Sequence, residues 1–392
     1  MLEVVSLFRE QGTVDELGIG PVRDAISNAL FPGLSVLHTR ARYLLFVPWL
    51  ARELEQEHVP ARQAQAKLRQ KEVELIHALL EGNAGIGIIG GDARESLKRF
   101  PSVVYWGALR RFGILRHPGT TAQYLRSLAS GGEAARRASR DDEGEVTEGA
   151  YGNWHGALPD MPADLLDAAT FDLTIEEADY LEERFLTSVP GSLLAHLIAS
   201  GSAVDVDEPW EHPSVGTARP ELRRSIDHAR AFSMVIHGAN LLYNLVLAEK
   251  VRELHERPED DQVERYQEQL EAWATELHTN QGFVTAWNLD DFWQLVGAHN
   301  ARIHPFTRDF INRWVELALD DPDGLDSRGE GGLLISGRER RVKGPLARVA
   351  DTRQLERWSG ESGLGRLDYR WSGAAKAIVR DVVGARRPAE VS

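Results

Sequence analysis

The chain has 392 residues, of which 42% are hydrophobic and ten are tryptophan, and this suffices for more than one packed lobe. It contains no cysteine, which excludes disulfides, thiolate metal sites and cysteine nucleophiles. The formal net charge is −15, but residues 151–280 carry 9 Lys and Arg against 25 Asp and Glu, whereas residues 331–392 carry 13 against 7. This distribution argues against non-specific nucleic-acid binding over the whole surface, and it is compatible with a local basic face near the C-terminus.

No uninterrupted apolar run has the length of a membrane span. The longest apolar run, residues 43–51, has nine residues and includes Pro48, whereas a spanning helix needs about 20. The first residues, MLEVVSLFRE, lack the charged and then apolar parts of a signal peptide. We therefore expect a soluble, cytoplasmic protein.

A basic stretch, HTRAR, leads directly into this apolar run. Residues 43–50 are apolar on every side of a helix, which predicts a buried helix that Pro48 kinks or restarts. His38, Arg40 and Arg42 either contact a phosphate or carboxylate ligand, or the two arginines pair with internal acids. We favour internal pairing, because basic clusters that bind nucleic acid usually lie on a wettable face. The acids nearest in sequence are Asp15, Glu16 and Asp24.

The rest of the chain is rich in helix signals. Strong helix formers fill residues 62–81, and a capping-box pattern at Thr174–Glu177 precedes an amphipathic run to about Leu186. Pro220 is placed to begin a long helix that reaches about Glu256. Two further helices are predicted, at residues 191–200 and 260–278.

These signals predict an all-α, multi-helix fold of two packed lobes with at most a small β ribbon. The ribbon would come from the short stretches IGIIG, residues 86–90, and GLLISG, residues 332–337. The polar residues 130–150 indicate a flexible linker, and residues 320–332 a turn-rich loop. The expected segments are an N-terminal lobe (1–129), the linker (130–150), a central acidic lobe (151–320) and a loop with a basic C-terminal segment (321–392).

Five blocks of the sequence together resemble a bacterial family of unknown function, a domain of about 400 residues. They are LFREQGTVDELGIGPVRDA, LFPGLSVLHTRARYLLFVPWL, SLKRFPSVVYWGALRRFGIL, HGANLLYNLVLAE and WSGESGLGRLDYRW. The resemblance covers nearly the whole chain. It implies a place among phage-defence genes, near helicases and nucleases, and it assigns no activity to any residue.

Motifs of common cofactors and metals are weak here. Gly85, Gly87 and Gly90 fit GxGxxG, but a helix precedes them where a dinucleotide site needs a strand, so a turn between helices is the better interpretation. His299 and His304 lie five residues apart just before Pro305, which is a poor metal spacing. We expect no cofactor and no metal.

Arg230 and His237 form the one catalytic candidate, on the predicted long helix. Seven residues is about two helical turns, so both side chains share a face. The spacing is similar to the active-site pattern of HEPN-type ribonucleases, in which His237 would act as acid or base and Arg230 would stabilise phosphorane charge. The competing interpretation is a core histidine bonded to Asn240 or Tyr243, with Gly238 serving close helix packing. We favour the core histidine.

The C-terminal segment combines arginines with aromatic residues, which both protein and nucleic-acid interfaces enrich. Pairing with the acidic middle of the chain is the alternative that leaves no binding face. The candidate binding residues are Arg338, Arg340, Arg341, Lys343, Arg353, Arg357, Arg366, Arg370, Trp371 and Lys376.

The sequence therefore predicts a non-enzymatic helical scaffold or adaptor of a bacterial anti-phage defence complex, with a helicase or nuclease as partner. A ribonuclease using Arg230 and His237, and a nucleic-acid-binding accessory protein using the basic C-terminal segment, are the two alternatives.

Overall fold

The computed structural model describes residues 15–128, 152–255 and 261–386. Their regular secondary structure is helical, and the β contact found among them is an isolated antiparallel bridge between Leu115 and Trp154. The all-α prediction is confirmed. The two stretches that could have formed a small ribbon do not, because residues 332–337 lie inside helix α14 (Glu330–Lys343) and residues 86–90 form turns. The predicted linker at residues 130–150 lies outside the described residues.

The chain divides into two compact units, each assembled from separate stretches. Unit 1 takes residues up to Leu30 together with residues 219–369. Unit 2 takes residues 31–218 together with residues 370–392. Composition suggests consecutive segments with boundaries at residues 129, 150 and 320, whereas the units are discontinuous along the chain.

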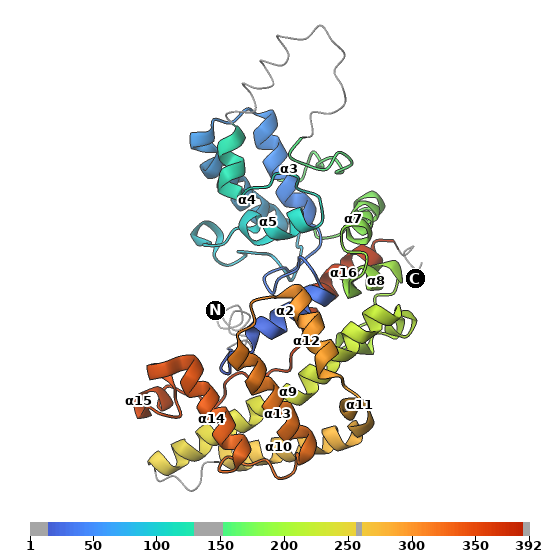
Figure 1. Ribbon diagram of the computed structural model, residues 1–392. Helices are drawn as coiled ribbons and strands as arrows, with labels where there is room; N and C mark the ends of the chain where they lie inside the picture. The colour runs from blue at the N-terminus through green and yellow to red at the C-terminus, as the bar shows by residue number, and fades with distance from the viewer. Residues whose placement is uncertain (1–14, 129–151, 256–260, 387–392) are drawn as a thin grey trace. The chain divides into compact units, whose positions relative to one another are not determined.

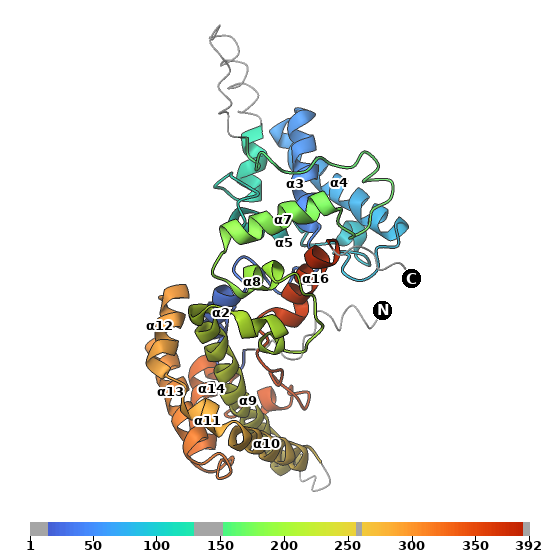
Figure 2. The same ribbon diagram turned by 90° about the vertical axis from the view of Figure 1, so that its right-hand side faces the viewer.

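Unit 1 is built on one long helix, α9 (Pro220–His255). Pro220 is its first residue, as predicted, and the described part of the helix runs to His255. In its most apolar 18-residue window, 89% of the residues are buried. Figures 1 and 2 show other helices of the unit lying along it, as their residue contacts confirm. These neighbours are α2 (Gly20–Leu30), α10 (Gln262–Thr279), α13 (Pro305–Asp320) and α14.

Shorter elements complete unit 1. Helix α12 (Leu289–His299) packs on α2, and α11 (Gln281–Thr285) follows α10. A 3-10 turn (Gly344–Leu346) and α15 (Thr352–Leu355) follow α14. The remaining residues, 356–369, are an irregular segment that returns to α9 and α10.

The contact between α9 and α10 depends on Gly238. A Cβ at this position would lie 2.3 Å from Cζ2 of Trp273, far inside van der Waals contact. The indole Nε1 of Trp273 donates to the Met234 carbonyl at 2.9 Å, so the ring is fixed against the backbone of α9. This close approach brings the side chains of α9 and α10 together around the cavity described below.

Unit 2 has its own core. Figures 1 and 2 show α3 (Tyr43–Gln56) beside α4 (Ala61–Glu81) and α5 (Pro101–Arg111). Residues 43–51 of α3 are all buried, as expected, and Pro48 stands inside the helix. A second group consists of α7 (Ile175–Ser188), α8 (Leu193–Ala199), a π turn (Trp371–Ala375) and α16 (Lys376–Gly384). The short 3-10 turns are Arg94–Ser96, Pro209–Glu211 and Pro213–Thr217.

Local signals placed several of these helices correctly. Residues 61–81 form α4, and the Thr174 hydroxyl accepts from the Glu177 amide in a complete capping box at the start of α7. These features are set by neighbouring residues, which is why the sequence predicts them.

The arginines before α3 pair with distant acids of unit 2. Arg40 Nε binds Asp381 at 2.9 Å, and Arg42 binds Glu177 at 2.8 Å. The acids nearest in sequence are occupied elsewhere: Asp15 accepts from two backbone amides, and Glu16 pairs with Lys343 and Arg348. The suggested partners are therefore wrong, because packing and not sequence proximity decides which acids reach these guanidinium groups.

Candidate functional site

Six of the ten C-terminal candidate residues are engaged inside their own unit. Arg338 is 8% exposed and donates to the carbonyls of Leu17, Gly18 and Phe306 and to the Thr307 hydroxyl. Trp371 is 1% exposed, with its Nε1 donating to the Val206 carbonyl. The other four are Lys343 with Glu16 and Glu339, Arg366 with Glu276, Lys376 with Asp205, and Arg370 with the Leu34 carbonyl.

The other four arginines are exposed, and all belong to unit 1. Arg340 and Arg341 lie on α14, and Arg353 and Arg357 lie in and just after α15. Leu333 on α14 is 69% exposed and Leu346 just after it is 62% exposed. Leu333 and Arg340 are seven residues apart, so they share a face of the helix. We call Leu333, Arg340, Arg341 and Leu346 the α14 surface.

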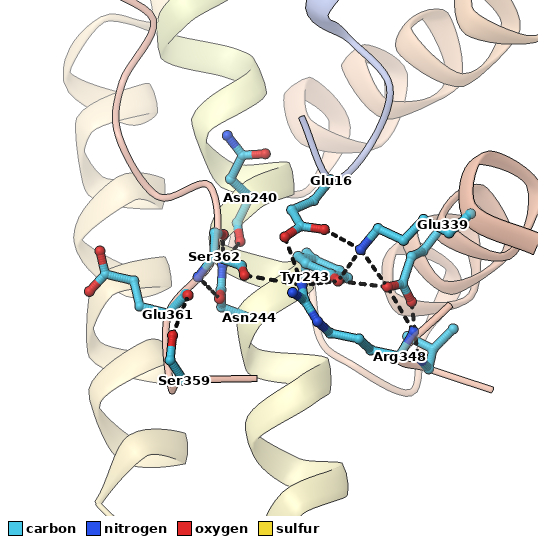
Figure 3. Close-up of polar contacts among 11 residues, drawn as sticks. Glu16, Asn240, Tyr243, Asn244, Glu339, Arg348, Ser359, Glu361 and Ser362 are labelled. Carbon is cyan, nitrogen blue, oxygen red and sulfur yellow. Dashed lines mark hydrogen bonds and ion pairs between the residues drawn. The ribbon is translucent and has the colours of Figure 1, made fainter. Parts of the chain in front are cut away.

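Behind this surface lies a buried polar network on Tyr243 of α9 (Figure 3). The Tyr243 hydroxyl donates to Glu339 Oε1 at 2.7 Å and accepts from Lys343 and Arg348. Arg348 also binds Glu16 at 2.7 Å. Burial alone would raise the pKa of Glu16 and Glu339, but hydrogen bonds from Lys343 to both, and from Arg348 to Glu16, hold each pKa below its usual value. The network therefore contains two carboxylates and two cations, and it links α9, α14 and the residues before α2.

The network extends to residues 359–366, which we call the wall segment. Asn244 Nδ2 donates to the Ser362 carbonyl at 2.7 Å, and Asn244 Oδ1 accepts from the Ser362 amide at 2.9 Å (Figure 3). The Tyr266 hydroxyl donates to the Gly360 carbonyl. Gly360 has φ +91°, a conformation that other residues rarely adopt. These contacts fix the wall segment against α9 and α10.

A cavity of about 630 Å³ lies between α9, α10 and the wall segment. Four of its lining residues, at positions 265, 269, 272 and 276, repeat at helical spacing along α10. The full lining is His237, Leu241, Arg265, Gln269, Ala272, Trp273, Glu276, Glu361, Leu364 and Arg366.

Two ion pairs lie in the cavity wall. Arg366 binds Glu276 with both of its terminal nitrogens, one of them at 2.9 Å from Glu276 Oε1. Arg265 and Glu361 approach to 3.5 Å, and their side chains are 45% and 36% exposed. The first pair is a two-point contact, whereas the second is a single longer contact at the rim.

His237 lines this cavity, and Arg230 is not among the lining residues. Burial, and secondarily the charge of Arg366, lowers the pKa of His237 to about 4, so its ring is neutral near pH 7. Its Nδ1 is buried without a hydrogen-bond partner among the described residues. The suggested partner Tyr243 donates instead to Glu339. Arg230 donates to Asn280 at 3.1 Å and stacks over Phe283, so the guanidinium groups that share the cavity with His237 are Arg265 and Arg366.

Arg265, Glu276 and Glu361 were not predicted from the sequence. The spacing of residues 265, 269, 272 and 276 shows that they share a face of α10, but only the structure shows that the wall segment covers that face. Glu361 and Arg366 both stand in the block WSGESGLGRLDYRW, on which the family resemblance partly rests. The resemblance of that block to the family was therefore the sequence feature that could have pointed to Glu361 and Arg366.

The glycine motif and the histidine pair have structural explanations. Gly85, Gly87 and Gly90 all have positive φ and form the turns that follow α4. His299 is the last residue of α12, and the His304 ring caps the N-terminus of α13. Over the described ranges, no group of three or more His, Asp or Glu side chains is arranged to hold a metal ion.

Comparison with known proteins gives one match. The model of a family described as a family of unknown function (DUF6361) matches residues 2–384. No curated protein and no solved structure matches the chain significantly.

Proposed function

Since the chain belongs to the family of unknown function DUF6361, we propose its role from the geometry: it is a non-enzymatic helical adaptor that binds an acidic partner protein through the α14 surface. The observation that carries this proposal is the combination, along α14 and the 3-10 turn that follows it, of exposed aliphatic side chains with arginines that have no acidic partner among the described residues. Arg340 and Arg341 form no ion pair with any described residue, whereas their neighbours Lys343 and Arg348 do.

The composition of the α14 surface favours a protein over a nucleic acid. Leu333 and Leu346 are both more than 60% exposed, and an interface core gains from burying such side chains beside arginine. Phosphate binding uses many cations and few aliphatic groups.

The chemistry of the partner follows from the charges. Four exposed arginines lie between residues 340 and 357, so the complementary surface carries Asp and Glu around an apolar centre. The sequence resemblance implies that this partner is a helicase or nuclease of a bacterial defence module, in the cytoplasm. The adaptor would then supply rigid helical surfaces, with chemistry performed by the partner.

Affinity purification of the tagged full-length protein from its native operon, with mass spectrometry and the 260/280 nm absorbance ratio, tests the proposal. We expect a stoichiometric protein partner that is lost with Arg340→Glu plus Arg341→Glu and with Leu333→Ser. The matched control is Arg223→Glu plus Arg224→Glu, two exposed neighbouring arginines at the start of α9, which should keep the partner. If the Arg340/Arg341 variant retains the partner as well as the Arg223/Arg224 control does, the proposal is wrong.

Two results would replace the adaptor by another function. Nucleic acid that copurifies, binds more weakly as salt rises and is released by the Arg340/Arg341 change would make the α14 surface a nucleic-acid site. Loss of a nuclease or defence activity in folded His237→Ala protein would support the ribonuclease prediction, which stays open to that experiment.

A further inference from the structure

The cavity between α9, α10 and the wall segment has balanced charges. It contains two arginines and two glutamates, and each arginine faces a glutamate across the gap between α10 and the wall segment. A purely anionic ligand at Arg265 would leave Glu361 unpaired and close to a like charge. A purely cationic ligand at Glu361 would leave Arg265 unpaired and close to a like charge.

The two pairs differ in how easily a ligand can enter them. Glu276 holds Arg366 at two points, so that pair is fixed. Arg265 and Glu361 touch at a single distance of 3.5 Å, and both side chains are partly exposed. An exposed single contact of this kind contributes little stability, so it can open to admit a ligand.

Part of the cavity lining offers apolar surface and one hydrogen-bond acceptor. Leu241, Ala272 and Leu364 supply aliphatic surface. His237 Nδ1 is buried without a partner, and a buried polar nitrogen is stabilised by any ligand N–H or O–H that reaches it. The volume lies in the range of roughly 300–1,000 Å³ that is typical of ligand sites, and six of the ten lining residues are polar or charged, so the cavity suits a ligand that carries polar groups beside its apolar part.

We propose that this cavity binds a zwitterionic α-amino acid with an apolar side chain. Its carboxylate pairs with Arg265 and its ammonium group with Glu361, so the contact of this pair is replaced and neither charge is left alone. The side chain lies on Leu241, Ala272 and Leu364, and His237 accepts a hydrogen bond from the ligand. Because Arg265 and Glu361 are only 3.5 Å apart, a ligand with both charges on one carbon fits them better than one with separated charges.

Titration calorimetry with full-length protein tests this inference with L-leucine and three analogues. The first, 4-methylpentanoate, lacks the ammonium group, and the second, 3-methylbutylamine, lacks the carboxylate. Leucyl-leucine, whose charges are further apart, distinguishes a free amino acid from a peptide. We expect saturable binding of L-leucine and at least tenfold weaker binding of all three analogues. Equal binding of 4-methylpentanoate and L-leucine overturns the zwitterion assignment. L-Phenylalanine serves as a second amino acid with an apolar side chain, and if neither it nor L-leucine binds, the site itself is overturned.

Variants then locate the binding. Arg265→Gln and Glu361→Gln should each weaken L-leucine binding at least tenfold, and Ala272→Phe should block it by filling the cavity while the charged residues of both pairs stay in place. Arg252→Gln and Glu264→Gln are the matched controls, since they break an exposed pair between α9 and α10 whose residues do not line the cavity. Circular dichroism verifies folding in every case. Unchanged binding in Arg265→Gln overturns the proposal, and the partner pull-down remains unaffected by that result.

Discussion

Asn244 binds both main-chain polar atoms of Ser362, a residue 118 positions further along the chain. One side-chain amide therefore substitutes for the pairing that a neighbouring strand would give. It also donates to the Asn240 carbonyl on its own helix, so every polar atom of this buried amide is used. This contact turns an irregular segment into a fixed wall of the cavity.

Asn244→Ala should lower the free energy of unfolding by about 2–4 kcal/mol, because the Ser362 amide and carbonyl lose their partners in a buried site. Urea denaturation followed by circular dichroism measures this. Gln267→Ala, at an exposed position of α10, is the control and should change stability by less than about 0.5 kcal/mol. Equal values for the two variants would mean that the wall segment contributes nothing to stability.

The same substitution should have opposite effects at two helical glycines. Gly238→Ala places a Cβ 2.3 Å from the Trp273 ring and should destabilise by about 1–3 kcal/mol, since α10 must move. At Gly337 a Cβ meets nothing within 4 Å, so Gly337→Ala should stabilise by up to about 1 kcal/mol through helix propensity alone. Thermal melts of both variants beside the wild type suffice. A gain in stability at Gly238 would contradict the close packing of α9 and α10.

Features set by neighbouring residues could be predicted from the sequence, whereas contacts between distant residues could not. The start of α9 at Pro220 and the capping box at Thr174 depend on residues within a few positions, so they could be predicted. The stretch GLLISG within α14 left a short strand open as an alternative, because its glycines are poor helix formers. The structure gives Gly331 a packing reason, since a Cβ there would lie 2.9 Å from Leu325 and 3.0 Å from Leu242.

The candidate site depends mostly on distant contacts. His237 was singled out by its chemistry and does line the cavity. Its guanidinium neighbours could not be predicted, because Arg366 meets Glu276 across 90 residues of sequence. Helical spacing placed Arg230 on the same face as His237, but the contact with Asn280 directs its guanidinium group to the junction of α10 and α11.

Arg338 and Arg340, two residues apart on α14, should respond very differently to replacement by methionine. Arg338→Met removes the donors for three backbone carbonyls and should cost about 2–4 kcal/mol, because at least the Leu17 carbonyl is bound at a buried position. Arg340→Met should cost less than about 0.5 kcal/mol, since the Arg340 side chain is exposed. Urea midpoints of the two variants provide the measurement. Similar midpoints would contradict a structural role for Arg338 and return it to the set of binding residues.

Glu72 of unit 2 should make stability depend on pH in an unusual direction. It is 2% exposed, its Oε1 accepts from the Ser102 amide at 2.6 Å, and burial raises its pKa from 4.5 to about 7. A carboxyl group with a raised pKa favours the folded state fully below about pH 4.5, and this contribution is lost as the pH rises through about 7.

Glu72→Gln keeps an acceptor for Ser102 and never ionises. It should therefore be more stable than the wild type at pH 8, by about 1–3 kcal/mol, and the difference should be much smaller at pH 5. Urea denaturation at both pH values gives the comparison, with Glu81→Gln on the exposed side of the same helix as control. A stability difference that is the same at pH 5 and pH 8 would show that Glu72 does not titrate between them.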